Sequence, residues 1–240
     1  MEESQQYIKD THSDPFRNDP LGNCPRIEPV SELTAPLNVM EPTLKEITEV
    51  VNKARTGSAL GPNGSPYKVY NMCSKLLRRL CNLLNVIWRN GKVPECWQQA
   101  AEIFTPKVKG SKRVIEFRTI PLLNVEGKLF FAVLPRRMAT FLTANRYIDT
   151  SVQKGGVPGF SGCLEHTSAI SQIIREAKVN NKDLTVIWLD LANAYGSIPH
   201  KLIGEAMKHY ELHPRTYTEI INDYFDGLQL RFSVGGQTTP

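Results

Sequence analysis

Asp190 is the residue of this chain whose surroundings most favour metal chemistry. It follows residues 186–189, a short run of β-branched and aromatic residues that is typical of a strand buried on both faces. A carboxylate directly behind such a strand is costly to bury unpaired, so we expect it to face a polar cleft, where a divalent cation is a natural partner. A second interpretation stays open, because an Asp after a strand commonly forms a turn or caps a helix.

A second group of candidates is cationic. Residues 100–106 alternate weakly and residues 117–120 form another short apolar run, so together they predict a β-hairpin. Between the two runs lie four cations, Lys107, Lys109, Lys112 and Arg113. A cationic hairpin tip can hold a triphosphate, since Arg binds phosphate oxygens bidentately and Lys acts as a point charge.

Residues 74–90 predict an amphipathic helix close to these cations in the sequence. Apolar residues recur at helical spacing, and Gly91 supplies the stop. The apolar stripe is predicted to be core. The opposite face carries Arg78 and Arg79, for which contact with nucleic acid and simple solvation are equally good interpretations.

Further elements are predicted from local signals. Thr43 and Glu46 form a capping-box pattern that begins a helix ending near Arg55. Helical spacing predicts helices within residues 129–142, 163–178, 199–210 and 214–225, with a kink or boundary at Pro135. Residues 227–234 alternate like a strand, whereas residues 57–66 and 151–159 are loops by composition. The first loop lacks the Gly-Lys-Ser/Thr ending of a nucleotide-binding P-loop.

Composition narrows the class of protein. The chain has 240 residues, 41% of them hydrophobic, which suits one domain or two small ones. It contains no apolar run of about 18 residues, and its first ten residues are too polar for a signal peptide, so we expect an intracellular protein, nuclear or cytoplasmic, that is not secreted and does not bind a membrane. The five cysteines are scattered, which disfavours zinc and a disulfide framework.

Charge is distributed unevenly. The net charge is only +5, but residues 51–150 hold 17 Lys and Arg against 5 Asp and Glu, and both flanks together are acidic. Such a local excess suits phosphate or nucleic acid, with a solvated basic surface as the alternative. Residues 1–40 show no sustained period and are predicted to be mostly disordered, and residues 41–240 to be folded.

The sequence Asp190-Leu-Ala-Asn-Ala-Tyr195, followed by Ile198-Pro199-His200, resembles the first catalytic carboxylate motif of reverse transcriptases. Its residues are most similar to those of non-LTR retrotransposon polymerases of the LINE type. The resemblance implies that Asp190 is a catalytic residue that holds magnesium. It also implies that Tyr195 is the steric gate against the ribose 2′-hydroxyl. Gly196 stands where the family commonly has Asp, which leaves the metal ligand untouched.

Three further stretches carry the same resemblance. Pro106-Lys107, then Phe117-Arg-Thr-Ile-Pro-Leu-Leu123 and Lys128, are similar to the fingers hairpin, which implies that Lys107 and Arg118 contact the incoming triphosphate and that Lys128 lies near nucleic acid. Thr119 replaces the common Pro. The loop at residues 57–66 resembles a Gly-Pro-Asp-Gly segment with Asn63 in place of Asp. The family's template-contact segment is matched by Gln153, Gly155 and Thr167, although Gly156 stands where Phe is usual.

The resemblance implies an α+β fold, a truncated right-hand polymerase with fingers and incomplete palm, rich in helices and with short antiparallel strands. The parent activity would be RNA-templated DNA synthesis by two-metal nucleotidyl transfer, with an RNA template, a DNA primer and deoxynucleoside triphosphates as partners. The Tyr-x-Asp-Asp motif is absent, so we expect this chain alone to be inactive and to bind magnesium weakly or not at all. Two alternatives remain: a non-catalytic nucleic-acid-binding remnant and a non-functional mobile-element fragment.

Overall fold

The computed structural model describes residues 2–12, 20, 22, 30, 32–55, 57–190, 194, 198–212, 214–234 and 237–238. The chain divides into two compact units. The first comprises Met1–Phe16, Val39–Pro135 and Glu211–Pro240, and the second comprises Arg17–Asn38 and Arg136–Tyr210. Both helices and strands are present, which confirms the α+β class.

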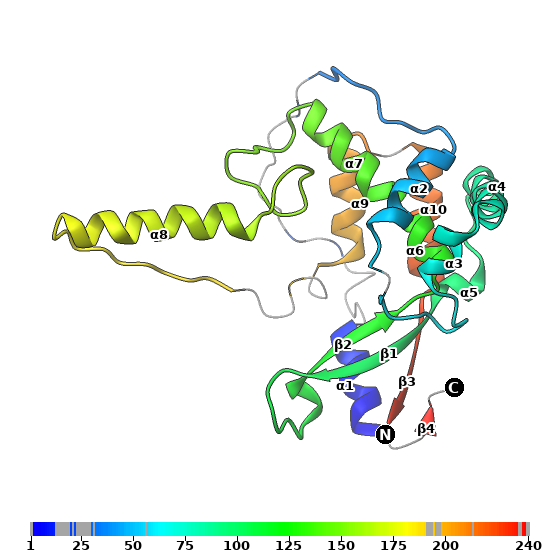
Figure 1. Cartoon of the computed structure of the whole chain (residues 1–240), viewed down its shortest axis with the longest axis horizontal. Coiled ribbons are helices and arrows are strands. Elements are labelled where there is room, and N and C mark those ends of the chain that lie inside the picture. The colour runs from blue at the N-terminus through cyan, green and yellow to red at the C-terminus, as the bar shows by residue number, and fades with distance from the viewer. Residues whose placement is uncertain are drawn as a thin grey trace. The chain divides into compact units, whose positions relative to one another are not determined.

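The first unit contains a four-stranded mixed sheet in the order β2-β1-β3-β4 (Figure 1). Strands β1 (Gln99–Pro106) and β2 (Phe117–Leu122) pair antiparallel, which confirms the predicted hairpin. Strand β3 (Gln229–Val234) pairs with β1 in parallel and with β4 (Gln237–Thr238) antiparallel. The short antiparallel strands that the resemblance implied are present in the β1–β2 and β3–β4 pairs, whereas the parallel β1–β3 pair was not expected. That pairing joins segments far apart in the sequence, and no local pattern specifies it.

The helices of the first unit are α1 (Glu2–His12), α2 (Leu44–Lys53), α3 (Tyr67–Met72), α4 (Ser74–Asn90), α5 (Glu95–Gln98), the 3₁₀ helix η1 (Val114–Glu116), α6 (Val125–Phe131) and α10 (Arg215–Gly227). Three of them, α2, α4 and α10, confirm predicted helices, and α6 covers the first part of another. The capping box at Thr43 is formed, and Gly91 ends α4 in the left-handed conformation at φ +66°. Helix α1 lies in the segment for which the sequence predicted no regular structure, and it packs against η1.

An aromatic cluster forms the centre of the first unit. Trp88 on α4 packs edge-on against Phe130 and Tyr217, with ring centroids 6.1 and 5.4 Å apart, and Trp97 lies 6.0 Å from Phe130. These side chains are almost completely buried, as is Leu84 at 0% exposure. Because α4, α5, α6 and α10 each contribute a large side chain, this cluster fixes the helices that flank the sheet.

The second unit contains most of α7 (Val133–Ala144), α8 (Cys163–Val179) and α9 (His200–His209). Pro135 lies in the first turn of α7, where its missing N–H is tolerated, and the boundary with α6 falls at Ala132. Asn145 holds the end of α7 to an earlier segment, since its Oδ1 accepts from the backbone N–H groups of Thr34 and Ala35 at 2.7 and 3.0 Å. Helix α8 has no buried residue.

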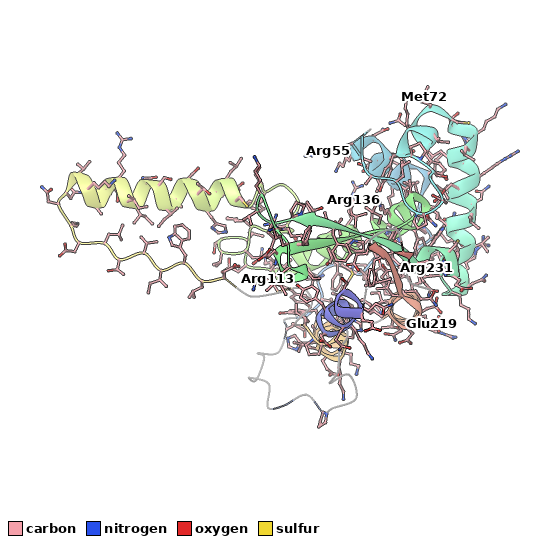
Figure 2. All side chains as sticks on the ribbon, turned by 90° about the horizontal axis from the view of Figure 1, so that it is seen from below. Arg55, Met72, Arg113, Arg136, Glu219 and Arg231 are labelled. Atoms are coloured by element: carbon pink, nitrogen blue, oxygen red, sulfur yellow. The ribbon has the colours of Figure 1, made fainter. Side chains whose placement is uncertain are left out.

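The predicted buried strand at residues 186–189 is not formed. In Figures 1 and 2 the segment that follows α8 runs back along that helix without joining a strand. Ile187, Trp188 and Leu189 are 77%, 77% and 93% exposed. No described segment pairs with them, and an extended segment is stabilised only when a neighbouring strand accepts its hydrogen bonds. The segment is apolar, but burial requires neighbours that the described residues do not supply.

Candidate nucleotide and nucleic-acid interface

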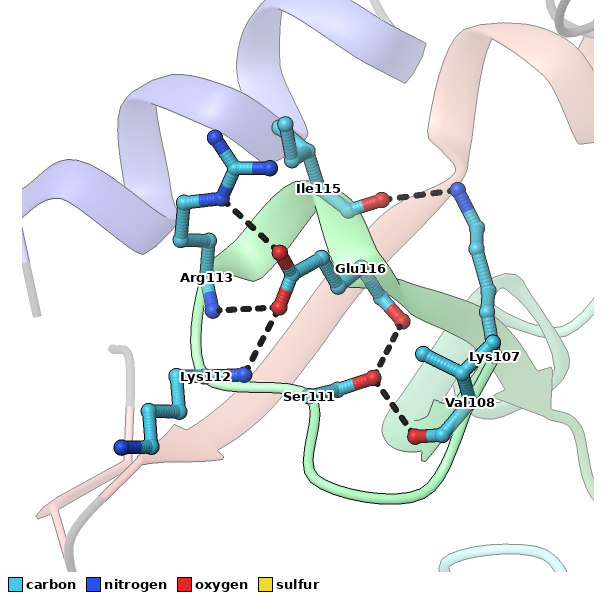
Figure 3. A network of polar contacts seen from close by, with 7 residues as sticks. All are labelled: Lys107, Val108, Ser111, Lys112, Arg113, Ile115 and Glu116. Carbon is cyan, nitrogen blue, oxygen red and sulfur yellow. Dashed lines mark hydrogen bonds and ion pairs between the residues drawn. The ribbon is translucent and has the colours of Figure 1, made fainter.

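The hairpin tip is folded around one carboxylate. Between β1 and β2, Glu116 accepts from the backbone N–H groups of Lys112 and Arg113 at 2.8 and 3.1 Å and from Arg113 Nε at 2.9 Å (Figure 3). Ser111 Oγ closes the turn by donating to the carbonyls of Val108 and Glu116 at 2.8 and 3.2 Å. The cations of the tip are therefore presented by an ordered turn.

The electrostatics of this turn favour the ionised carboxylate. The two backbone N–H groups, followed by the guanidinium of Arg113, lower the pKa of Glu116 to about 2. The negative charge of Glu116 thus offsets the positive charge of Arg113. Lys109 and Lys112 remain as exposed cations of the tip. This role was not predicted from the sequence. A single acidic residue three positions after Arg113 in a basic turn could have indicated it.

The two residues predicted to contact a triphosphate belong to the same hairpin. Lys107 is exposed at the end of β1, and its Nζ donates to the Ile115 carbonyl at 2.7 Å, which uses one of its three donors (Figure 3). Arg118 lies on β2 opposite Thr105, and its side chain is exposed. Because the side chain is exposed, the five N–H donors of the Arg118 guanidinium are accessible to a ligand.

Helix α4 presents the second group of predicted cations. Leu77, Leu80, Leu84 and Trp88 are buried, which confirms the predicted core stripe. Arg78 and Arg79 are exposed on the other side of the helix. The structure therefore brings these two cations to the surface, while their contact with nucleic acid remains a prediction.

Near the open end of the hairpin, the loop at residues 57–66 is tied to α6. The backbone N–H of Asn63 donates to Asn124 Oδ1 at 3.0 Å, and its Nδ2 donates to Glu126 Oε2 at 3.0 Å. Lys128 donates to the Ala59 carbonyl at 3.3 Å, and partial burial lowers the pKa of Lys128. Lys128 therefore binds the loop in this structure, and its direct contact with nucleic acid remains a prediction.

The glycine-rich loop of the second unit is ordered by its own contacts. Gln153 is exposed and its Nε2 donates to the Gly155 carbonyl at 2.7 Å. Lys154 Nζ lies 4.5 Å from the ring centroid of Phe160, which is a cation–π distance. The loop therefore has a defined conformation, whereas contact of Gln153 and Gly155 with a template stays a prediction.

Asp190 is exposed and belongs to the second unit, whereas Lys107 and Arg118 belong to the first. Tyr195 lies outside the described residues. Among the residues that the structure describes, no group of three or more His, Cys, Asp and Glu side chains is arranged to hold a metal ion. Asp190 supplies one carboxylate, and a two-metal site needs several, so no catalytic step through magnesium follows from these residues.

The described fold and site define an α+β protein with an exposed cationic hairpin, and comparisons with known proteins add its relationship. No family model matches the chain. It is 28% identical over 167 residues to the Pol polyprotein of the type-1 retrotransposable element R2 of Nasonia vitripennis, covering 70% of this chain and 15% of that protein. It is 23% identical over 177 residues to the Pol polyprotein of the type-2 element R2DM of Drosophila melanogaster, covering 73% and 16%.

A third relative is the Pol polyprotein of the type-1 element R2 of Bradysia coprophila, which is 28% identical over 155 residues and covers 65% of this chain and 17% of that protein. The aligned region is thus about one sixth of each relative. The chain carries a region similar to the Pol polyproteins of R2 non-LTR retrotransposons, which confirms the resemblance to a retrotransposon reverse transcriptase. In the part of the chain that the structure describes, no helix has the length and apolar character to span a membrane.

Proposed function

We propose that this chain is the fingers and first palm segment of a retrotransposon reverse transcriptase, and that it binds nucleic acid and the triphosphate of an incoming nucleotide. The observation that carries the proposal is the exposed cationic β1–β2 hairpin in a chain similar to R2 Pol polyproteins. Arg118 and Lys107 hold the triphosphate, and Arg78 and Arg79 attract the nucleic-acid backbone.

The complete enzyme would add deoxynucleotides to a primer on an RNA template. Asp190 would contribute one carboxylate toward magnesium, and Tyr195 would lie beside the sugar of the nucleotide. Because one carboxylate does not hold two cations, we expect no templated primer extension by this chain alone. Magnesium binding by this chain would be weak.

Salt-dependent binding tests the proposal. A labelled RNA–DNA primer–template is titrated with the purified chain over a range of salt concentrations. Neutralising one phosphate-binding cation is expected to weaken binding and to reduce the slope of log affinity against log salt by about 1. Arg78→Ala and Arg79→Ala should show this effect, whereas Arg55→Ala, another exposed arginine of the first unit, should not. Equal effects of all three substitutions would contradict the proposal.

A non-catalytic nucleic-acid-binding protein is the second candidate, and the exposed Arg78 and Arg79 on α4 favour it. The two candidates differ at the hairpin. If Arg118→Ala leaves the binding of deoxynucleoside triphosphate unchanged while Arg78→Ala still weakens the binding of RNA, the second candidate is correct. A chain without a cooperative thermal transition would instead support a non-functional fragment.

A further inference from the structure

The loop at residues 59–65 is held in one conformation although it contains no helix or strand. Its own turn is closed by the Gly64 N–H, which donates to the Gly61 carbonyl at 3.0 Å, and by the Ser65 N–H, which donates to Asn63 Oδ1 at 3.1 Å. The remaining groups of Asn63 reach α6, as described above. A short irregular loop that has hydrogen bonds within itself and to a neighbouring helix is preorganised rather than mobile.

Asn124 connects this loop to both ends of the hairpin. It is the second residue after β2 and is only 4% exposed. Its Oδ1 accepts from the Asn63 N–H at 3.0 Å, and its Nδ2 donates at 2.7 Å to the carbonyl of Cys96 in α5, the short helix that leads into β1. One amide therefore joins the entry to β1, the exit from β2 and the loop, and no charge is involved.

Backbone contact reinforces the attachment. A Cβ at Gly61 would lie 2.3 Å from the Leu123 carbonyl oxygen and 2.5 Å from Asn124 Cα, so the loop rests directly on the junction between β2 and α6. Next to this contact, Pro62 lines a groove of about 520 Å³ together with residues of β1 and with Arg231 and Phe232 of β3. Figure 2 shows Arg231 on β3. The loop thus forms one wall of a groove that contains an exposed cation.

Glu126 holds the loop from the other side. Its Oε2 accepts from Asn63 Nδ2, and its Oε1 accepts from the hydroxyl of Tyr70, which is 7% exposed. Burial, this hydrogen bond and the charge of Glu126 raise the pKa of Tyr70, so the phenol remains a donor. The Tyr70 hydroxyl occupies Oε1 of Glu126, while Oε2 is the oxygen that holds Asn63.

We infer that Asn124 and Glu126 are positioning residues that preorganise the loop at residues 59–65 for a nucleic-acid strand lying in the groove beside it. The inference rests on the proposed function. The loop exposes Leu60, Pro62 and Asn63 toward solvent, so a bound strand can meet them without rearrangement. A loop that is ordered before binding does not lose conformational freedom when the strand arrives, which strengthens binding without adding a contact.

Glu126→Ala gives the sharpest test, because charge and positioning predict opposite results. Removing an acidic charge strengthens the binding of a polyanion if only electrostatics matters. If Glu126 positions the loop, the substitution weakens binding of a short single-stranded RNA about threefold to tenfold, the equivalent of one or two lost hydrogen bonds. The salt slope stays unchanged, because no phosphate contact is removed. Unchanged or tighter binding would overturn the inference.

Tyr70→Phe is the matched control. It removes a hydrogen bond from the same carboxylate but leaves the Asn63–Glu126 bond in place, so RNA affinity should change much less than in Glu126→Ala. Asn124→Ala should weaken RNA binding in the same way as Glu126→Ala. Thermal melting of Glu126→Ala and Asn124→Ala shows whether either variant fails to fold. If one does, the RNA affinity of the other tests the positioning role.

Amide hydrogen exchange gives a readout that needs no ligand. The N–H groups of Asn63 and Ser65 should exchange faster in Glu126→Ala and Asn124→Ala than in Tyr70→Phe. If the unmodified chain binds no RNA, the proposed function fails and the nucleic-acid role of the loop fails with it. If RNA binds but the loop amides exchange equally in all variants, the proposed function stands and the positioning role is wrong.

Discussion

Asn63 Nδ2 donates a hydrogen bond to Glu126 Oε2 at 3.0 Å, so an amide stands beside this carboxylate. The bond joins residues 63 positions apart and crosses from a loop to a helix. An aspartate at position 63 would place a second carboxylate beside Glu126. The choice of Asn63 is therefore matched to Glu126 in this chain.

Asn63→Asp should destabilise the first unit by about 1 kcal/mol at neutral pH, because a hydrogen bond is replaced by repulsion between two partly solvated carboxylates. Urea denaturation at pH 7 measures this loss. The double substitution Asn63→Asp with Glu126→Gln should recover most of the lost stability, and a failure to recover would show that the two residues are not coupled.

Gly61→Ala should destabilise the chain by about 1–3 kcal/mol, because the added methyl group would overlap the Leu123 carbonyl and the loop would have to move. Thermal or urea denaturation provides the measurement. Gly57→Ala is the control in the same loop, since a Cβ there meets no atom within 4 Å. Similar losses at both positions would mean that the loop does not rest on the β2–α6 junction.

The hairpin tip should respond to acid through Glu116. Its pKa is lowered from about 4.5 to about 2 in the folded hairpin, so its stabilising contribution is complete above pH 4.5 and is lost as the pH falls from 4.5 to 2. A carboxyl-carbon NMR titration should give a midpoint near 2 for Glu116. Glu116→Gln should abolish the acid response of the neighbouring Lys112 and Arg113 amide signals. A midpoint near 4.5 would contradict the bonds described for this turn.

Leu84→Ala should remove about 2–5 kcal/mol of stability, because Leu84 is completely buried beside the aromatic cluster and the truncated side chain leaves a cavity. Leu83→Ala is the matched control one residue earlier on α4, where the side chain is 47% exposed and little stability should be lost. The two variants have the same chemical change, so a difference in the urea midpoint reports burial alone. Equal urea midpoints for the two variants would mean that Leu84 does not lie on the buried face of α4.

Local signals made several of the helices predictable, but not α1. The apolar spacing over Leu77, Leu84 and Trp88, together with the Gly91 stop, predicted the bounds of α4, and the capping box predicted the start of α2. The hairpin followed from two short runs around a basic turn. In each case the information lies within a few residues of the element that it specifies.

The remaining features depend on partners far along the chain. Asn124 reads as an ordinary residue before a helix, and only the structure reveals that its amide bonds Asn63 and Cys96. The strand expected before Asp190 failed for the same reason, because composition records the apolar character of a segment but not whether another strand will lie beside it. Pairing between segments that are distant in the sequence therefore could not be predicted from this single sequence.

The exposed indole of Trp188 makes the segment before Asp190 optically accessible. The other two tryptophans, Trp88 and Trp97, are 3% and 4% exposed, whereas Trp188 is 77% exposed. A soluble quencher such as acrylamide should therefore extinguish one class of emission readily and leave the other almost untouched. Any binding partner that covers the segment would shield the quenchable class and shift its emission to shorter wavelength, so the folded chain contains its own fluorescent reporter two residues from its candidate metal ligand.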